Sequence, residues 1–173
     1  YQVNQRYLPW RASKDPYTIW LSEIILQQTR IDQGQKYWEK FLNKFPTIQS
    51  LASAKESEVL ALWSGLGYYS RARNIHKTSK IIVKKYSNEF PSSSRELAEL
   101  PGIGPYTAAA ISSICFNEVI PALDGNAFRV YSRLFGIDLP IEKSIAINTI
   151  KDLALPLISE KQPGDSNQAI MDI

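Results

Sequence analysis

The stretch 100–126 contains backbone amides that could bind an anion without the help of charged side chains. Gly102 and Gly104 stand directly before a predicted helix that begins at Pro105. Glycine lets another backbone approach closely, and the first amides of a helix have no partner within the helix. This arrangement predicts a site for one phosphate group. A purely structural helix turn explains the same residues equally well.

Two acidic residues lie beside apolar stretches. Asp124 follows an apolar helix, between Leu123 and Gly125, at a predicted helix boundary. Glu23 lies within the apolar segment 21–26 of a predicted helix. A carboxylate in that position either tilts toward solvent or is buried for a function, and in an arbitrary helix the solvent-facing orientation is the more common one. The residues alone leave both alternatives open for Glu23.

Helices must position these groups, because no stretch shows the alternation of apolar and polar residues that is typical of a β-strand. The sequence predicts an all-α fold of about ten helices joined by short links. Asp15-Pro16 opens the first helix, and Gly65–Tyr69 forms a turn that presents two aromatic residues. The predicted helices cover approximately residues 17–29, 32–45, 47–52, 56–64, 70–86, 95–99, 105–116, 127–135, 142–155 and 164–173.

The composition sets limits on function. The chain has 173 residues, 44% of them apolar, and a net charge of +3. This mild excess of positive charge does not establish a nucleic-acid partner. The single cysteine, Cys115, excludes an internal disulfide and a four-thiolate metal site, and its apolar spacing predicts a buried small side chain. No apolar run is long enough to span a membrane, so we expect no membrane partner.

Longer sequence motifs point to a family. LPGIGPYTA (100–108), followed by LDGN (123–126), resembles the helix-hairpin-helix and Gly/Pro-rich loop with aspartate of the DNA glycosylase superfamily that includes endonuclease III. LPWR (8–11), WLSEIILQQT (20–29) and GLGYYSRARN (65–74) look like the MutY-type adenine DNA glycosylases. The resemblance covers essentially the whole chain, in the family's order and spacing.

The resemblance implies a helix-hairpin-helix glycosylase fold. We expect a six-helix barrel domain over residues 17–116, with residues 1–16 and 117–173 forming a truncated second helical domain. Family members continue past Met171-Asp172-Ile173 into four cysteines that bind a [4Fe–4S] cluster, and then into a domain that recognises 8-oxoguanine. The chain is therefore expected to be a catalytic-core fragment without a cofactor of its own.

The same resemblance assigns catalytic roles. Glu23 would protonate N7 of adenine. Asp124 would stay ionised and stabilise the oxocarbenium ion at the sugar, with action as a transient nucleophile on C1′ as a further alternative. This division of labour follows the two-carboxylate logic of glycoside hydrolysis. Tyr106 and Asn126 would position or hydrogen-bond these groups. With this assignment, Glu23 is expected to be a buried functional acid whose pKa is raised by its apolar neighbours.

Substrate-binding positions also follow from the resemblance. Trp10, Arg11 and Leu26 match residues that line the base pocket, and Gln28 would fill the gap left by a flipped base. Tyr68 would wedge into the stack of the partner strand, although a core tyrosine is the alternative. Flipping costs a few kcal/mol and is easiest at a mismatch.

The hairpin residues are expected to bind the DNA backbone. The amides near Gly102 and Gly104, with Ile103 and Thr107 beside them, would hold the phosphate next to the lesion. Hairpins of this kind also bind a bare cation through backbone carbonyls, here around Leu100 and Ile103. No metal site built from cysteines is expected.

The resemblance predicts a monofunctional enzyme. Relatives that also cut DNA carry a lysine at the position of Tyr106, and a phenol cannot form their Schiff base. The predicted reaction is hydrolytic removal of adenine opposite 8-oxoguanine or guanine, by a monomer acting on double-stranded DNA. The location would be cytoplasmic and nucleoid-associated in a bacterium, and nuclear or mitochondrial in a eukaryote. The alternatives are another glycosylase of the superfamily, acting on thymine mismatches or oxidised pyrimidines, and a DNA-binding but inactive fragment.

Overall fold

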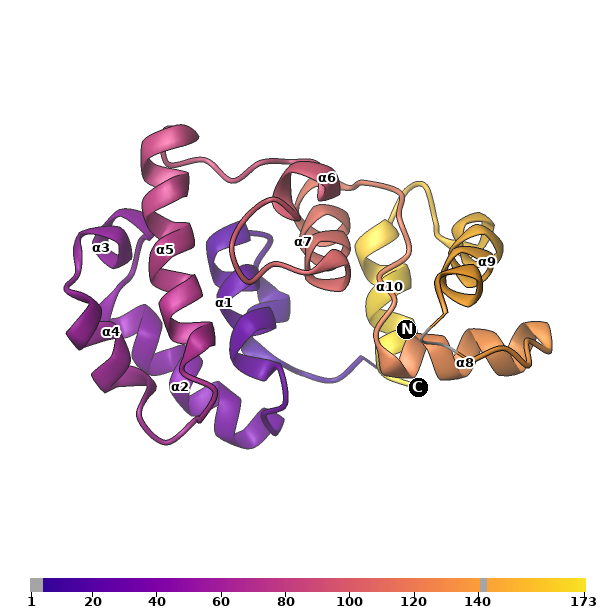
Figure 1. Ribbon diagram of the computed structural model, residues 1–173, viewed down its shortest axis with the longest axis horizontal. Coiled ribbons are helices and arrows are strands. Elements are labelled where there is room, and N and C mark those ends of the chain that lie inside the picture. The colour runs from indigo at the N-terminus through magenta and orange to yellow at the C-terminus, as the bar shows by residue number, and fades with distance from the viewer. Residues whose placement is uncertain (1–4, 141–142) are drawn as a thin grey trace.

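Helices account for all the regular structure in the computed structural model, which describes residues 5–140 and 143–173 (Figure 1). No strand occurs among these residues, so the predicted all-α class is confirmed. The α-helices are α1 (Pro16–Leu26), α2 (Ile31–Lys44), α3 (Ile48–Ser53), α4 (Glu56–Trp63), α5 (Ser70–Lys85), α6 (Ser94–Leu97), α7 (Pro105–Phe116), α8 (Gly125–Phe135), α9 (Ser144–Ala154) and α10 (Pro163–Met171). Two short 3₁₀ helices, Pro9–Ala12 and Leu155–Leu157, complete the set.

Local sequence signals explain several helix starts. The Asp15 carboxylate accepts the Thr18 amide at 3.0 Å and caps α1, which begins at Pro16. Thr47 caps α3 in a reciprocal pair with Ser50. These are the residue types that satisfy the unpaired amides at helix starts.

The first helix ends earlier than its apolar pattern predicts. The pattern extends to Thr29, whereas α1 ends at Leu26 and a turn follows. Gln28 takes a left-handed conformation, with φ of 54°, which no helix continues through. The predicted start of α9 at Glu142 lies outside the described residues.

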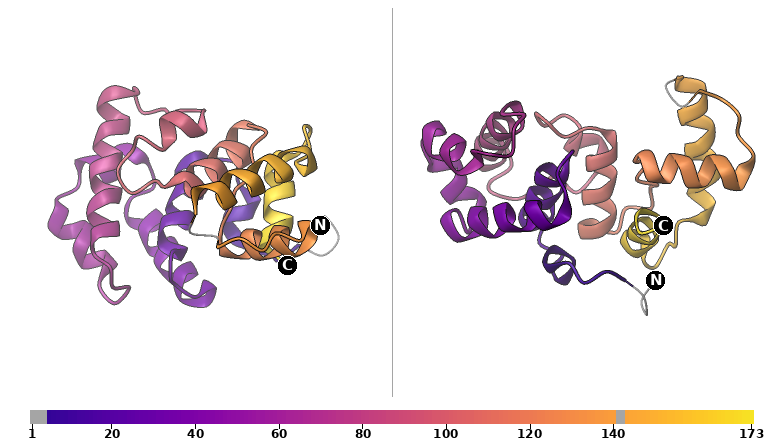
Figure 2. Two further views of the ribbon diagram at one scale, coloured as in Figure 1. Left: turned by 45° about the vertical axis from the view of Figure 1, so that its right-hand side comes forward. Right: turned by 90° about the horizontal axis from the view of Figure 1, so that it is seen from below.

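Two groups of buried side chains form the core. The larger group joins α1–α7 around Trp20, Phe41 and Trp63, and the smaller joins α8 and α9 through Tyr131 and Ile150. Figures 1 and 2 show α2–α5 on one side of the molecule, α8 and α9 on the other, and α10 beside α7 between them. The domain boundaries given above stay predictions.

Helix α10 fixes the segment that leads from α7 to α8. Gly164 packs so closely that a Cβ there would lie 2.7 Å from Ile114 Cα. The buried Asn167 side chain accepts the Ala122 amide and donates to the Ile120 carbonyl, each at 2.9 Å. These contacts fix the position of the segment that leads to Asp124, the residue before α8.

None of the helices in the described residues has the length and apolar character needed to cross a membrane.

Candidate active site

A cavity of about 460 Å³ opens where α1, α7 and α10 meet the N-terminal strip and the start of α8. Its size lies in the range of small-molecule sites. All the residues assigned above to catalysis or to the base pocket line it: Trp10, Arg11, Glu23, Leu26, Gln28, Tyr106, Asp124 and Asn126. The fold therefore brings together residues from four separate parts of the chain.

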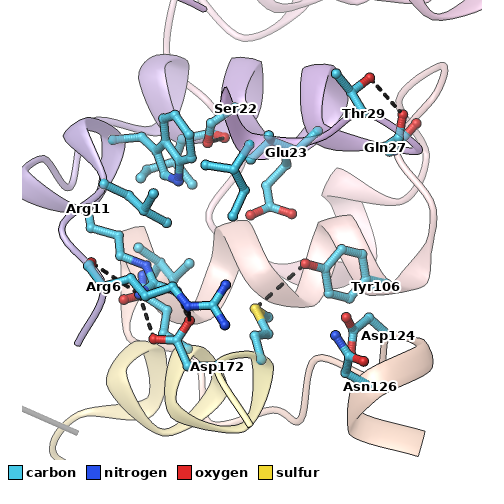
Figure 3. A pocket seen from close by; sticks show the side chains of 18 of the residues that line it. Arg6, Arg11, Ser22, Glu23, Gln27, Thr29, Tyr106, Asp124, Asn126 and Asp172 are labelled. Atoms are coloured by element: carbon cyan, nitrogen blue, oxygen red, sulfur yellow. Dashed lines mark hydrogen bonds and ion pairs between the residues drawn. The ribbon is translucent and has the colours of Figure 1, made fainter. Parts of the chain in front are cut away.

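Glu23 projects from α1 into this cavity (Figure 3). Its neighbours Ile24 and Ile25 are buried in the core, so the turn of the helix leaves Glu23 facing the cavity. The pKa of Glu23 is raised to about 7, chiefly by burial and also by the nearby Asp124 carboxylate, against the lowering effects of the Tyr106 hydroxyl and the Arg11 guanidinium. At neutral pH a substantial fraction of Glu23 is therefore protonated.

Tyr106 lies in the first turn of α7, with its hydroxyl directed into the cavity (Figure 3). The hydroxyl donates to Met171 Sδ at 3.7 Å, and it lies close enough to Glu23 to lower the pKa of that carboxyl group. Burial raises the pKa of Tyr106, and the Glu23 carboxylate raises it further. The phenol therefore stays protonated and serves only as a neutral donor.

Asp124 is the N-cap of α8 and faces the same cavity as Glu23. One of its carboxylate oxygens accepts the Ala127 amide at 2.7 Å, which fixes the side chain. Asn126 lies beside it, in the first turn of α8 (Figure 3). A carboxylate held in this way is preorganised to stabilise positive charge that develops in the cavity.

An ion pair between distant parts of the chain closes one end of the cavity. Arg11 Nη1 and Nη2 donate to the two Asp172 carboxylate oxygens at 2.7 and 2.9 Å, and Arg6 Nε lies 3.9 Å from the same carboxylate. This bidentate pair joins the N-terminal 3₁₀ helix to the end of α10. No sequence motif indicates a role for Arg6, Asp172 or Met171, because no local pattern marks contacts between residues so far apart.

Replacing Asp172 by asparagine is expected to lower Tm by about 2–8 °C, because removing one partner of a partly buried ion pair costs on the order of 1–2 kcal/mol. Arg11 holds the pKa of Asp172 below its usual range, so the pair contributes fully above about pH 4 and is lost as pH falls through the lower folded-state pKa. Thermal melting between pH 3 and 7 measures both effects. An equal difference in Tm between the two proteins at every pH would contradict this assignment.

Gln27 is a further cavity residue that the sequence analysis did not assign to the site. It lies four residues after Glu23, directly after the end of α1, and this helical spacing could have identified it. Its side-chain amide donates to the Thr107 hydroxyl at 3.5 Å. The Thr107 side chain is buried, so any contact of this residue with DNA would be through its backbone.

The residues assigned to the DNA backbone and stack lie outside the cavity. Tyr68 is 65% exposed, at the turn before α5, so the alternative of a core tyrosine is wrong. Gly102 has a φ of 80°, and a Cβ there would lie 2.7 Å from Asn74 Cβ. The Thr78 hydroxyl donates to the Pro101 carbonyl at 2.8 Å and holds the hairpin turn against α5.

The two other hairpin residues differ in exposure. The Ile103 side chain is buried, so only its backbone is available to a partner. Gly104 is the N-cap of α7 and has open space around the position of a Cβ. The turn thus presents backbone groups, which are what a phosphate site of this kind needs, and phosphate binding there stays a prediction.

The described residues do not fit a [4Fe–4S] cluster, which needs four cysteine thiolates. Cys115 is partly buried, and burial raises the pKa of its thiol to about 12. No group of three or more His, Cys, Asp or Glu side chains in the described parts of the chain is placed to hold a metal ion. At the predicted cation site, the Leu100 carbonyl accepts the Ile103 amide at 3.1 Å, and a bound cation there stays a prediction.

The sequence of this chain is similar to those of known proteins. The model of the HhH-GPD superfamily base excision DNA repair proteins matches residues 21–153. The adenine DNA glycosylase of Buchnera aphidicola subsp. Acyrthosiphon pisum is 46% identical over 171 residues, which cover 96% of this chain and 47% of that protein. The human adenine DNA glycosylase is 37% identical over 182 residues, covering all of this chain and 33% of that protein. The chain thus spans about half the length, or less, of these curated relatives.

Solved structures share the fold. A thermostable thymine-DNA glycosylase superposes with a TM-score of 0.89 at 27% identity, covering 99% of this chain and 79% of that one. A non-covalent endonuclease III–DNA complex gives a TM-score of 0.80 at 20% identity, covering 98% of this chain and 77% of that one. The arrangement of helices around the cavity is therefore a known one.

Proposed function

The chain belongs to the HhH-GPD superfamily of base excision DNA repair proteins, and we propose that it hydrolyses the N-glycosidic bond of a mispaired adenine in double-stranded DNA. The observation that supports this proposal most is the pair of carboxyl groups in one cavity, Glu23 with a pKa of about 7 and Asp124 opposite it. The chain's relatives at 37–46% identity are adenine DNA glycosylases.

The reaction divides between the two acids. Glu23 transfers its proton to N7 of adenine as the bond between C1′ and N9 breaks, and the bonding electrons leave with the base. The Asp124 carboxylate stabilises the cationic sugar, and water then supplies the hydroxyl group at C1′ and releases a proton. A placed proton donor contributes about 10²–10⁴-fold to such a rate, and fixed charge supplies a further part.

We expect three exposed features to bind the DNA. We expect the amides beside Gly102 and Gly104 to bind the phosphate next to the flipped nucleotide. Gln28 would fill the space that the adenine leaves, and Tyr68 would enter the stack of the opposite strand. Specificity for 8-oxoguanine or guanine opposite the adenine, action as a monomer, and the cellular location remain parts of this proposal.

A glycosylase for thymine mismatches is the second candidate, because the thymine-DNA glycosylase shares the fold with a TM-score of 0.89. The pKa of Glu23 favours adenine, since a proton donor near neutrality suits departure of a purine through its ring nitrogen. A third candidate, a fragment that binds DNA without cleaving it, needs neither acid in the cavity.

Single-turnover assays distinguish these candidates. Duplexes with adenine opposite 8-oxoguanine or guanine, and with thymine opposite guanine, are incubated with the protein and analysed with and without alkali. We expect adenine release from the first two, and strand breaks only after alkali, because Tyr106 cannot form a Schiff base. Release of thymine alone, binding without release, or strand breaks without alkali would contradict the proposal.

The Tyr106→Phe variant tests the acid role of Glu23 through pH. The Tyr106 hydroxyl lowers the pKa of Glu23, so removing it raises that pKa above about 7. Because the protonated form is the active one, kcat/KM of the wild type falls as pH rises through 7, and in the variant this fall moves to higher pH. If the pH at which kcat/KM falls is unchanged in the variant, or is lower than in the wild type, the proposed contact between Tyr106 and Glu23 is contradicted.

A further inference from the structure

Two of the five non-glycine residues with positive φ in the described part of the chain are the exposed residues expected to enter the duplex, Gln28 at the cavity and Tyr68 outside it. Gln28 has a φ of 54° and Tyr68 a φ of 46°, both in the left-handed region. For residues other than glycine this conformation is unfavourable, and it persists only where the surroundings enforce it. The two residues lie on different turns, 27–29 after α1 and 64–69 before α5.

One buried arginine contacts the first of these turns. Arg71, in the first turn of α5, is only 8% exposed. Its Nη1 donates to the carbonyls of Ile24 and Ile25 at 3.2 Å each, and also to the Gln27 carbonyl. It lies 3.5 Å from the Thr29 hydroxyl as well. The guanidinium thus satisfies the carbonyls at the end of α1, which no helical amide reaches.

The same guanidinium contacts the second turn. Its Nη2 donates to the Leu66 carbonyl at 3.3 Å and to the Gly67 carbonyl at 3.5 Å. It also lies over the rings of Trp63 and Tyr68, 5.0 and 5.6 Å from their centroids. A single side chain therefore bonds to both turns that present the exposed residues.

We propose that Arg71 is a positioning residue for base extrusion: its guanidinium holds the turns of Gln28 and Tyr68 in a fixed relation, so that both enter the duplex together. The proposal rests on the proposed glycosylase function. A planar fork of donors can bond to two turns at once, whereas the single ammonium of a lysine acts as one point of charge. The charges that act on Glu23 are those of Asp124 and Arg11, so Arg71 affects flipping and not proton donation.

The test compares Arg71→Lys and Arg71→Met with wild type on two duplexes. One has adenine opposite 8-oxoguanine, and the other has adenine opposite an abasic analogue, where an unpaired base is easier to extrude. We expect both variants to lose about 10–100-fold in single-turnover rate on the paired duplex, the loss typical of misplaced positioning groups. On the unpaired duplex we expect most of this loss to disappear. The pH at which kcat/KM falls should stay that of wild type.

Two controls separate positioning from folding. Arg133→Met removes an exposed arginine from α8 and should leave both rates unchanged. All rates are measured well below the Tm of each variant, and if Arg71→Met does not fold, the more conservative Arg71→Lys decides. Equal losses on the two duplexes, or no loss on the paired one, would overturn the proposal.

A third readout does not depend on catalysis. A duplex with 2-aminopurine in place of the adenine becomes more fluorescent when the base leaves the stack. We expect wild type to raise this fluorescence and both Arg71 variants to raise it much less at saturating protein. If wild type extrudes the base but releases no adenine from either duplex, the proposed function fails while the role of Arg71 stands. Equal fluorescence in wild type and variants would refute that role.

Discussion

Replacing Glu23 by glutamine is expected to slow adenine release by about 10²–10⁴-fold, the usual contribution of a placed general acid. Glutamine has nearly the same shape but no proton to transfer to the leaving base. The variant removes the carboxyl whose burial raises its pKa to about 7, so the fall in kcat/KM above neutral pH should disappear with it. Single-turnover rates at several pH values measure both effects.

A matched substitution controls for the loss of one carboxyl group. Glu39 lies exposed on α2, accepts a hydrogen bond from Gln35 at 2.9 Å, and does not line the cavity. Glu39→Gln should retain the wild-type rate. Affinity of Glu23→Gln for a duplex with an abasic analogue should also match wild type. A Glu23→Gln rate within about threefold of wild type, far less than a general acid supplies, would contradict the assignment.

Replacing Asp124 by asparagine is expected to reduce the rate by about 10²–10³-fold without destabilising the protein. Asp124 has two roles, as the N-cap that accepts the Ala127 amide and as the negative charge facing the cavity. Asparagine is as good an N-cap as aspartate but carries no charge. The substitution therefore separates the two roles.

Asp124→Ala provides the comparison, since it removes the cap as well as the charge. It should be as slow as Asp124→Asn and should also lose about 1 kcal/mol of stability, or roughly 2–4 °C in Tm. Thermal melting and single-turnover rates of the two variants show whether the charge of Asp124 or its capping hydrogen bond supports catalysis. If Asp124→Asn keeps the wild-type rate while Asp124→Ala loses it, the residue contributes through the cap alone.

Much of the helical framework could be predicted from short-range signals. Asp15-Pro16 marks the start of α1, Thr47 the start of α3 and Gly136 the end of α8. The side chains of Asp15 and Thr47 accept amides of the adjacent helical turn, and Gly136 ends its helix by its left-handed backbone conformation. Such signals need no tertiary contact. The end of α1 could not be predicted, because Gln28 leaves the helix in a conformation supported by contacts from α5.

The site was only partly predictable. Family motifs pointed to Glu23, Tyr106 and Asp124, but the raised pKa of Glu23 depends on burial and on charges from other elements. The partner of Arg11 is Asp172, 161 residues away, and no periodicity or spacing connects the two. Long-range pairs of this kind are visible only when the chain is folded.

The most direct test of the central claim is an NMR titration of the side-chain carboxyl carbons, with Glu23→Gln used to assign the resonance of Glu23. We predict one glutamate that titrates near pH 7 in the wild type and whose resonance is missing from the variant. A Glu23 resonance that titrates near the ordinary glutamate value of about 4.3 would contradict the claim that this residue holds a proton for the leaving base.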